Sequence, residues 1–154
     1  MPRLTELFAG RLALLALALW LGACAAEPPP PPGLADYIEA QEALAADDFV
    51  AARSALERLR DSGPPAVKEA AAQAAGAEVG DLRMAFRGVS EVVARQPVPE
   101  GYALAYCPMV MDARGENEIG GHWVQREGKV MNPYFGAAML HCGAFREGRG
   151  AESP

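Results

Sequence analysis

The sequence predicts a mainly α-helical domain: an antiparallel helical bundle followed by a small irregular C-terminal lobe that contains at most one short β-hairpin. Between residues 34 and 95, larger apolar side chains recur every three or four positions in alanine-rich segments. After Pro99 the composition changes to Tyr, Trp, Met, Cys, Gly and Asn. Apolar residues at helical spacing give each helix one face to bury, and three or four antiparallel helices bury such faces together.

The first helices are predicted from their stripes and their boundaries. Tyr37 and Leu44 mark a first amphipathic helix, and Asp47 and Asp48 provide an N-cap for a second, because Asp accepts hydrogen bonds from the free amides of a first turn. Residues 63–65, Gly-Pro-Pro, end the second helix and open the next. The second helix buries the stripe Phe49, Ala52, Leu56 and Leu59.

A longer helix is predicted next, and it ends at residues 96–99. Glu91 and Arg95, one turn apart, are expected to pair on its outer side. In the lobe we expect a loop over residues 115–121, a hairpin of residues 122–125 with 129–131, and two helical turns over residues 136–142. The stripe of the long helix is Val79, Leu82, Phe86, Val89 and Val93.

The N-terminus is predicted to be a lipoprotein signal peptide, residues 1–23. Arg3 and Arg11 precede or adjoin an apolar run, residues 12–21, which has the length of a signal h-region and is too short to span a bilayer. The run ends in Leu-Gly-Ala-Cys, which resembles a lipobox, so Cys24 is the expected lipidation site. The alternative is an ordinary cleaved signal with a chance cysteine. Ala25, in place of Asp, favours the outer membrane, with the domain facing the periplasm.

A proline-rich linker, residues 24–33, is expected to act as a semi-rigid spacer between the lipid and the folded domain, residues 34–146. Residues 147–154 are an expected disordered tail. The formal charge of −6 argues against nucleic-acid binding. The chain has no phosphate loop, no Cys-x-x-Cys pair and no His-Glu-x-x-His motif, so we expect no enzyme.

Sulfur-bearing residues gather in two motifs of the lobe. Cys107 and Met109 are two apart and share one side of an extended chain, whereas Met139 and Cys142 are three apart and share one face of a helix. Together they offer thiolates and thioethers, which select Cu(I) or Ag(I). A Cys107–Cys142 disulfide and a core role for the methionines stay open as alternatives. Of the two histidines, His141, beside Cys142, is a better candidate ligand than His122.

These motifs also carry a resemblance. Tyr-Cys-Pro-Met at 106–109, Trp123, Asn-Pro-Tyr-Phe-Gly at 132–136 and Met-Leu-His-Cys-Gly at 139–143 resemble the signature of domain of unknown function family 3347, over residues 34–145. That family comprises periplasmic or lipoprotein domains, some fused to adaptors of heavy-metal efflux pumps. The segment 111–121 is longer and more acidic than this family leads us to expect. The resemblance implies a helical domain associated with copper handling, with an efflux adaptor as partner.

Two functions are therefore expected. The first is a membrane-tethered periplasmic domain that binds or buffers a soft metal, Cu(I) or Ag(I), through Cys107, Met109, Met139, Cys142 and His141. The alternative is a non-catalytic interaction module, stapled by a Cys107–Cys142 disulfide, that docks onto an envelope or efflux assembly.

Overall fold

The structure is a computed structural model that describes residues 30–146. The predicted signal peptide, Cys24, the first residues of the linker and the tail 147–154 lie outside the described residues. The chain forms the helices α2 (Leu34–Ala45), α3 (Phe49–Ser62), α4 (Pro65–Ala75) and α5 (Leu82–Val93), and the strands β1 (Tyr102–Cys107), β2 (Gly121–Arg126) and β3 (Ala144–Arg146). Two short 3₁₀ segments, η1 (Val79–Asp81) and η2 (Gly136–Ala138), precede α5 and β3.

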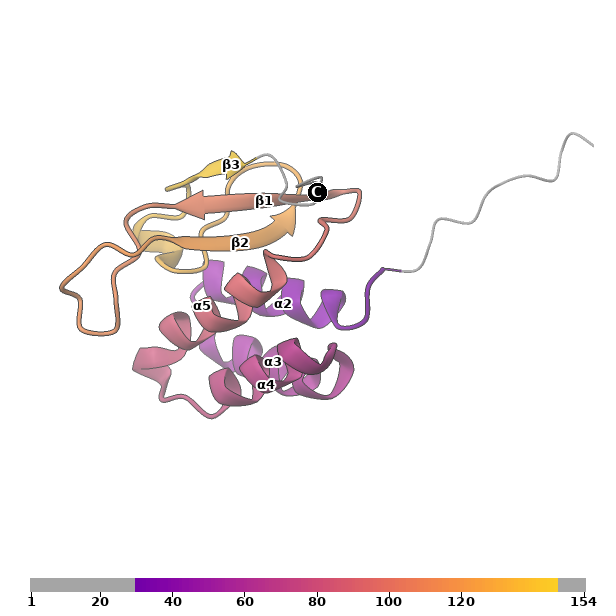
Figure 1. Cartoon of the computed structure of the whole chain (residues 1–154). Helices are drawn as coiled ribbons and strands as arrows, with labels where there is room; N and C mark the ends of the chain where they lie inside the picture. Colours follow the sequence, from indigo (N-terminus) through magenta and orange to yellow (C-terminus); the bar gives the residue numbers. More distant parts are fainter. Residues whose placement is uncertain (1–29, 147–154) are drawn as a thin grey trace, which may run out of the picture.

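The helices and the sheet form successive layers (Figure 1). Helices α2 and α5 lie next to β2, and α3 and α4 pack on the side of them away from the sheet. One core of apolar side chains runs through these layers, from Leu59 of α3 through Phe86 of α5 to Trp123 of β2. The part of the chain that the structure describes is thus mainly helical, as predicted, but its lobe is built on a three-stranded antiparallel sheet.

The predicted boundaries of α3 have clear local causes. The Asp48 carboxylate accepts a hydrogen bond from the Ala51 amide at 2.9 Å, which caps the N-terminus of α3. At the other end Gly63 is extended, and Pro65 occupies the first turn of α4. Gly33, where the chain enters α2, has a φ of 80° and packs so closely that a Cβ there would lie 2.7 Å from the Gly63 Cα. The entry of the chain is therefore fixed against the α3–α4 turn.

Two expectations for the long helix were wrong. Helix α5 begins at Leu82, and Val79 lies in η1 with 54% of its surface exposed, because the chain makes a tighter 3₁₀ turn there before the helix starts. Glu91 contacts Arg87, one turn before it, and His122 of β2 rather than Arg95. The face of α5 that carries Glu91 is therefore turned toward the sheet and not toward solvent.

The predicted hairpin was also wrong. Strand β2 pairs with β1, from Tyr102 opposite Arg126 to Cys107 opposite Gly121, and β3 pairs with the other edge of β1. Residues 129–131 form no strand; they fold back onto the buried Gln125 side chain, whose Nε2 donates to the Lys129 carbonyl at 2.7 Å. The Gln125 Oε1 accepts from the Met131 N–H at 2.9 Å, so this side chain replaces the backbone pairing that a hairpin would have provided.

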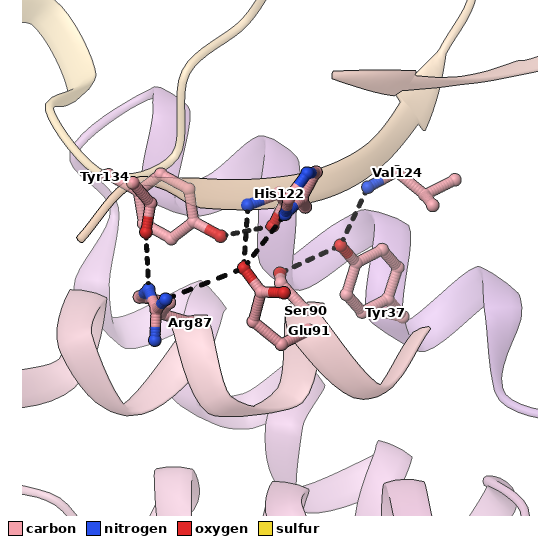
Figure 2. A network of polar contacts seen from close by, with 8 residues as sticks. Tyr37, Arg87, Ser90, Glu91, His122, Val124 and Tyr134 are labelled. Carbon is pink, nitrogen blue, oxygen red and sulfur yellow. Dashed lines mark hydrogen bonds and ion pairs between the residues drawn. The ribbon is translucent and has the colours of Figure 1, made fainter. Parts of the chain in front are cut away.

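The helices cover the open edge of β2 with polar side chains (Figure 2). The Tyr37 hydroxyl of α2 accepts from the Val124 amide at 3.1 Å and lies 2.9 Å from the Ser90 hydroxyl of α5. Burial raises the pKa of Tyr37 well above its ordinary value, so the phenol stays protonated. An edge strand otherwise presents unpaired amides, and here one of them is taken by a buried side chain.

A second anchor lies two residues earlier on the same edge (Figure 2). The Glu91 carboxylate accepts from the His122 amide at 3.0 Å, and the His122 ring lies beside it. The His122 ring also packs against Tyr106 in a tilted arrangement, with 4.6 Å between centroids. The Tyr134 hydroxyl donates to the His122 carbonyl. His122 therefore has a structural role in joining α5 to the sheet.

The two ends of β1 have different neighbours. Pro31 and Gly33, at the start of the described chain, line one small apolar pocket together with residues 97–99, which lead into β1. Cys107 is the last residue of β1, at the opposite end of the strand (Figure 1). Within residues 30–146, no helix combines the length and the apolar character that crossing a membrane requires.

Candidate functional site

Cys107 lies on the sheet face that the C-terminal segment covers. Alternation along β1 places Cys107 on the same side as Ala105, whose partner on β2 is Trp123. The chain crosses this face closely, because a Cβ on Gly143 would lie 2.9 Å from the Trp123 ring. Cys107 is consequently fully buried beneath the segment that carries Cys142.

Three sulfur atoms from the two motifs meet at this place. The Sγ atoms of Cys107 and Cys142 are 3.3 Å apart, and both residues are free thiols. The Sγ of Cys142 lies 3.8 Å from the Sδ of Met109, which follows β1 and is 43% exposed. The group is therefore closed on the Cys107 side and open to solvent on the Met109 side.

The other two candidate ligands are placed differently. The expected helix over residues 136–142 was wrong: η2 ends at Ala138, and Met139 and Cys142 lie in a turn in which the Cys142 amide donates to the Met139 carbonyl at 3.0 Å. Among the described residues, the sulfur atoms in contact are those of Cys107, Cys142 and Met109, and not that of Met139. The exposed His141 ring places Nδ1 2.7 Å from the Val130 carbonyl, so this nitrogen is the donor.

The helix failed to form because the backbone of this segment is committed elsewhere. Gly136 has a φ of 54°, and its position packs against Asp47 and Arg83. The Asp47 carboxylate accepts from the Ala137 amide at 3.0 Å, which ties the segment to the start of α3. The short helical turn that follows ends at Met139, whose φ of −148° and ψ of 48° lie outside the helical region.

Contact with Cys107 shifts the protonation of the Cys142 thiol. The hydrogen bond with Cys107, and then burial, raise the pKa of Cys142 above that of an ordinary thiol. At neutral pH the Cys142 thiol is therefore protonated, and a metal that binds its sulfur must release that proton. Two reactions are open to such a group: closure to a disulfide, or binding of a soft cation by thiolate and thioether sulfur.

The sequence did not reveal one residue that supports this site. The Asn132 side-chain amide donates to the Cys142 carbonyl at 2.7 Å. In the sequence, Asn132 stands out only as the first residue of the Asn-Pro-Tyr-Phe-Gly motif at 132–136, and its ten-residue reach to Cys142 has no local signature. Within the part of the chain described, no three His, Cys, Asp or Glu side chains lie close enough together to hold a metal ion. The third sulfur of this group comes from Met109, which is a thioether.

The segment 111–121 forms a closed loop beside the site. The Asp112 carboxylate accepts from the Arg114 and Glu116 amides, at 3.1 and 3.0 Å, and from the Asn117 side chain at 2.7 Å. These bonds, that of Asn117 above all, hold the pKa of Asp112 below its ordinary range. The carboxylate is used to organise the loop itself.

No protein-family model, no curated protein and no solved structure matches this chain. The resemblance of residues 106–109 and 139–143 to domain of unknown function family 3347 stays a prediction.

Proposed function

We propose that this protein is a lipid-tethered periplasmic domain that binds or buffers a soft monovalent metal, Cu(I) or Ag(I), at Cys107, Cys142 and Met109. The observation that supports the proposal is the convergence of these three sulfur atoms, at 3.3 and 3.8 Å, from two segments more than thirty residues apart. Soft thiolate and thioether donors favour Cu(I) over harder cations.

The arrangement suits uptake and release. The buried Cys107 provides a ligand that solvent does not reach, whereas Met109 is half-exposed and neutral. A thioether contributes no charge and is exchanged more readily than a thiolate. Metal would therefore enter and leave on the Met109 side, and the cysteines would hold it.

The geometry changes the ligand set that spacing predicted. Met109 contacts Cys142 directly, and we propose it as the third ligand. Met139 and His141 belong to the predicted set as well. The sulfur contacts of the site do not involve them, and the His141 ring bonds to the Val130 carbonyl instead. Met109 belongs to the ligand set based on geometry, whereas Met139 belongs only to the set based on spacing. Replacing each methionine separately therefore distinguishes the two sets.

The membrane anchor and the partner are proposed from the sequence. The lipobox at residues 21–24 supports a lipid anchor at Cys24, and Ala25 supports the outer membrane. The motif resemblance supports a heavy-metal efflux adaptor as the partner that delivers or receives the metal.

The alternative is a stapled interaction module. The same 3.3 Å separation of the thiols favours it, because only a small movement would bring the two sulfurs to bonding distance in an oxidising compartment. The module would then hold β3 and the C-terminal segment on the sheet, and it would need no metal.

Titration of the reduced full chain with Cu(I), against a competing chelator under anaerobic conditions, tests the proposal. Cys24→Ser removes the third thiol of the chain from the measurement. We expect Met109→Leu to weaken Cu(I) binding about tenfold, or about 1.4 kcal/mol. The swap roughly conserves volume, so its cost in stability should stay below about 1.5 kcal/mol.

Met139→Leu is the matched control and should leave the affinity unchanged, as should Met84→Leu on α5. Equal affinity of the wild type and of a Cys107→Ser, Cys142→Ser variant would contradict metal binding and leave the stapled module. A loss with Met139→Leu but not with Met109→Leu would favour the spacing-based ligand set.

A further inference from the structure

Asn132 is completely buried, and each of its polar groups has a partner. Its amide N–H donates to the Leu140 carbonyl at 2.7 Å, and its carbonyl accepts from the Gly136 N–H at 3.1 Å. In the side chain, Oδ1 accepts from the Tyr134 N–H at 2.8 Å and Nδ2 donates to the Cys142 carbonyl at 2.7 Å. One residue thus joins the beginning, the middle and the end of the segment 132–142.

The bond from Asn132 to Cys142 matters because little regular structure holds this cysteine. The segment contains only the three-residue η2, and the Cys142 amide donates to Met139 within the same turn. Asn132 Nδ2 reaches the Cys142 carbonyl from outside this turn. The buried Asn132 amide therefore adds, to the local bond with Met139, the side-chain contact that fixes the Cys142 carbonyl.

The next residue transmits this position to the sheet. Gly143 has a φ of 132°, and a Cβ there would lie 2.9 Å from both the Trp123 ring and the Tyr106 carbonyl. A shift of the Cys142 carbonyl would move this closely packed crossing and would carry the Cys142 thiol away from Cys107. A distance of 3.3 Å between two sulfurs is sensitive to such a shift.

We propose that Asn132 is a positioning residue that sets the thiol–disulfide equilibrium of Cys107 and Cys142. In the step concerned, the two thiols lose two electrons and two protons, an S–S bond forms, and glutathione disulfide is reduced to two molecules of glutathione. The orientation of the Asn132 amide increases the effective concentration of one thiol at the other. Control of metal binding by this equilibrium rests on the proposed function, because an oxidised pair has no thiolate to offer a metal. The thiol–disulfide equilibrium itself requires no metal.

The test measures the equilibrium of the full chain carrying Cys24→Ser, in mild detergent, against buffers of reduced and oxidised glutathione. Asn132→Asp keeps the Oδ1 acceptor for Tyr134 and removes the donor to Cys142. We expect the equilibrium constant for disulfide formation to fall about tenfold, and the potential to become less negative by about 30 mV. Asn132→Ala, which introduces no charge, should shift it in the same direction.

Ser90→Ala is the matched control. Ser90 is as buried as Asn132, and its hydroxyl contacts Tyr37 in the helical layers, so its loss should lower the melting temperature without changing the potential. The proposal would be overturned if both Asn132 variants kept an equilibrium constant for disulfide formation within twofold of the value with Asn132 present. An equal shift in Ser90→Ala would overturn it too. Failure of both Asn132 variants to fold would overturn it as well, because Asn132 would then hold the whole lobe. Absence of Cu(I) binding, by contrast, would leave this inference intact.

Discussion

Replacement of Tyr37 by Phe removes one hydroxyl from the contact between α2, α5 and β2. That hydroxyl lies 2.9 Å from the Ser90 hydroxyl and accepts from the Val124 amide at 3.1 Å. The ring itself would stay in place, stacked on Phe86 with 5.5 Å between centroids. The substitution therefore isolates two buried hydrogen bonds from the packing around them.

The expected loss follows from the partners that remain. The Ser90 hydroxyl can rotate to a carbonyl of its own helix, so its bond contributes about 1 kcal/mol. The Val124 amide lies on the outer edge of β2, is buried, and would have no partner, which costs about 1–3 kcal/mol. We expect Tyr37→Phe to lower the free energy of unfolding by about 2–4 kcal/mol in total.

Urea denaturation followed by circular dichroism measures this loss, with an unchanged m-value as the sign that the folded state is the same. Tyr102→Phe is the matched control, because the hydroxyl of the partly buried Tyr102 makes no hydrogen bond with the described residues. Its removal should change stability by less than about 0.5 kcal/mol. A loss for Tyr37→Phe no larger than that of the control would refute the role of the hydroxyl in closing the β2 edge.

Three further outcomes are expected. Cys24→Ser should abolish membrane association in a fractionation assay, and unchanged sedimentation with membranes would contradict the lipid anchor. Asp48→Ala should lower the free energy of unfolding by about 1 kcal/mol in urea, because the cap of α3 at Ala51 is lost. The raised pKa of Cys142 means that the folded reduced protein holds this proton more tightly than the unfolded chain does, so stability should fall as the pH rises above about 8.5. Cys142→Ser should lack that part of the decline, and an identical pH dependence in both proteins would argue against the shift.

The helices were predictable where the signal is local. Asp48 caps the helix it precedes, and residues 63–65 end one helix and begin the next through properties of Gly and Pro that need no tertiary contact. Val79 misled because it continues the apolar spacing of α5, although the chain at that point turns more tightly than an α-helix. A stripe indicates the face of a helix better than its first residue.

The sheet and the site depend on contacts that local patterns do not contain. β1 and β2 are separated by the loop after Cys107, and nothing in residues 122–131 indicates that Gln125, rather than a second strand, pairs with residues 129–131. The two cysteine motifs were identified by residue type, and spacing alone included Met139. That choice assumed a helix, whereas the chain leaves helical geometry at Met139 itself.

The chain enters the domain near one end of β1, and the sulfur group lies at the other end. This arrangement affects how a partner can approach a membrane-tethered domain. The described chain begins beside residues 97–99, before β1, whereas Cys107 ends that strand. On the proposed anchor at Cys24, the entry side would face the bilayer and the sulfur group would lie on the side away from it, so a partner need not approach the lipid. The linker would set the height of the site above the surface, at about 3.1 Å for each extended residue. Shortening the linker should then change which partners can be reached and leave the affinity for metal as it was.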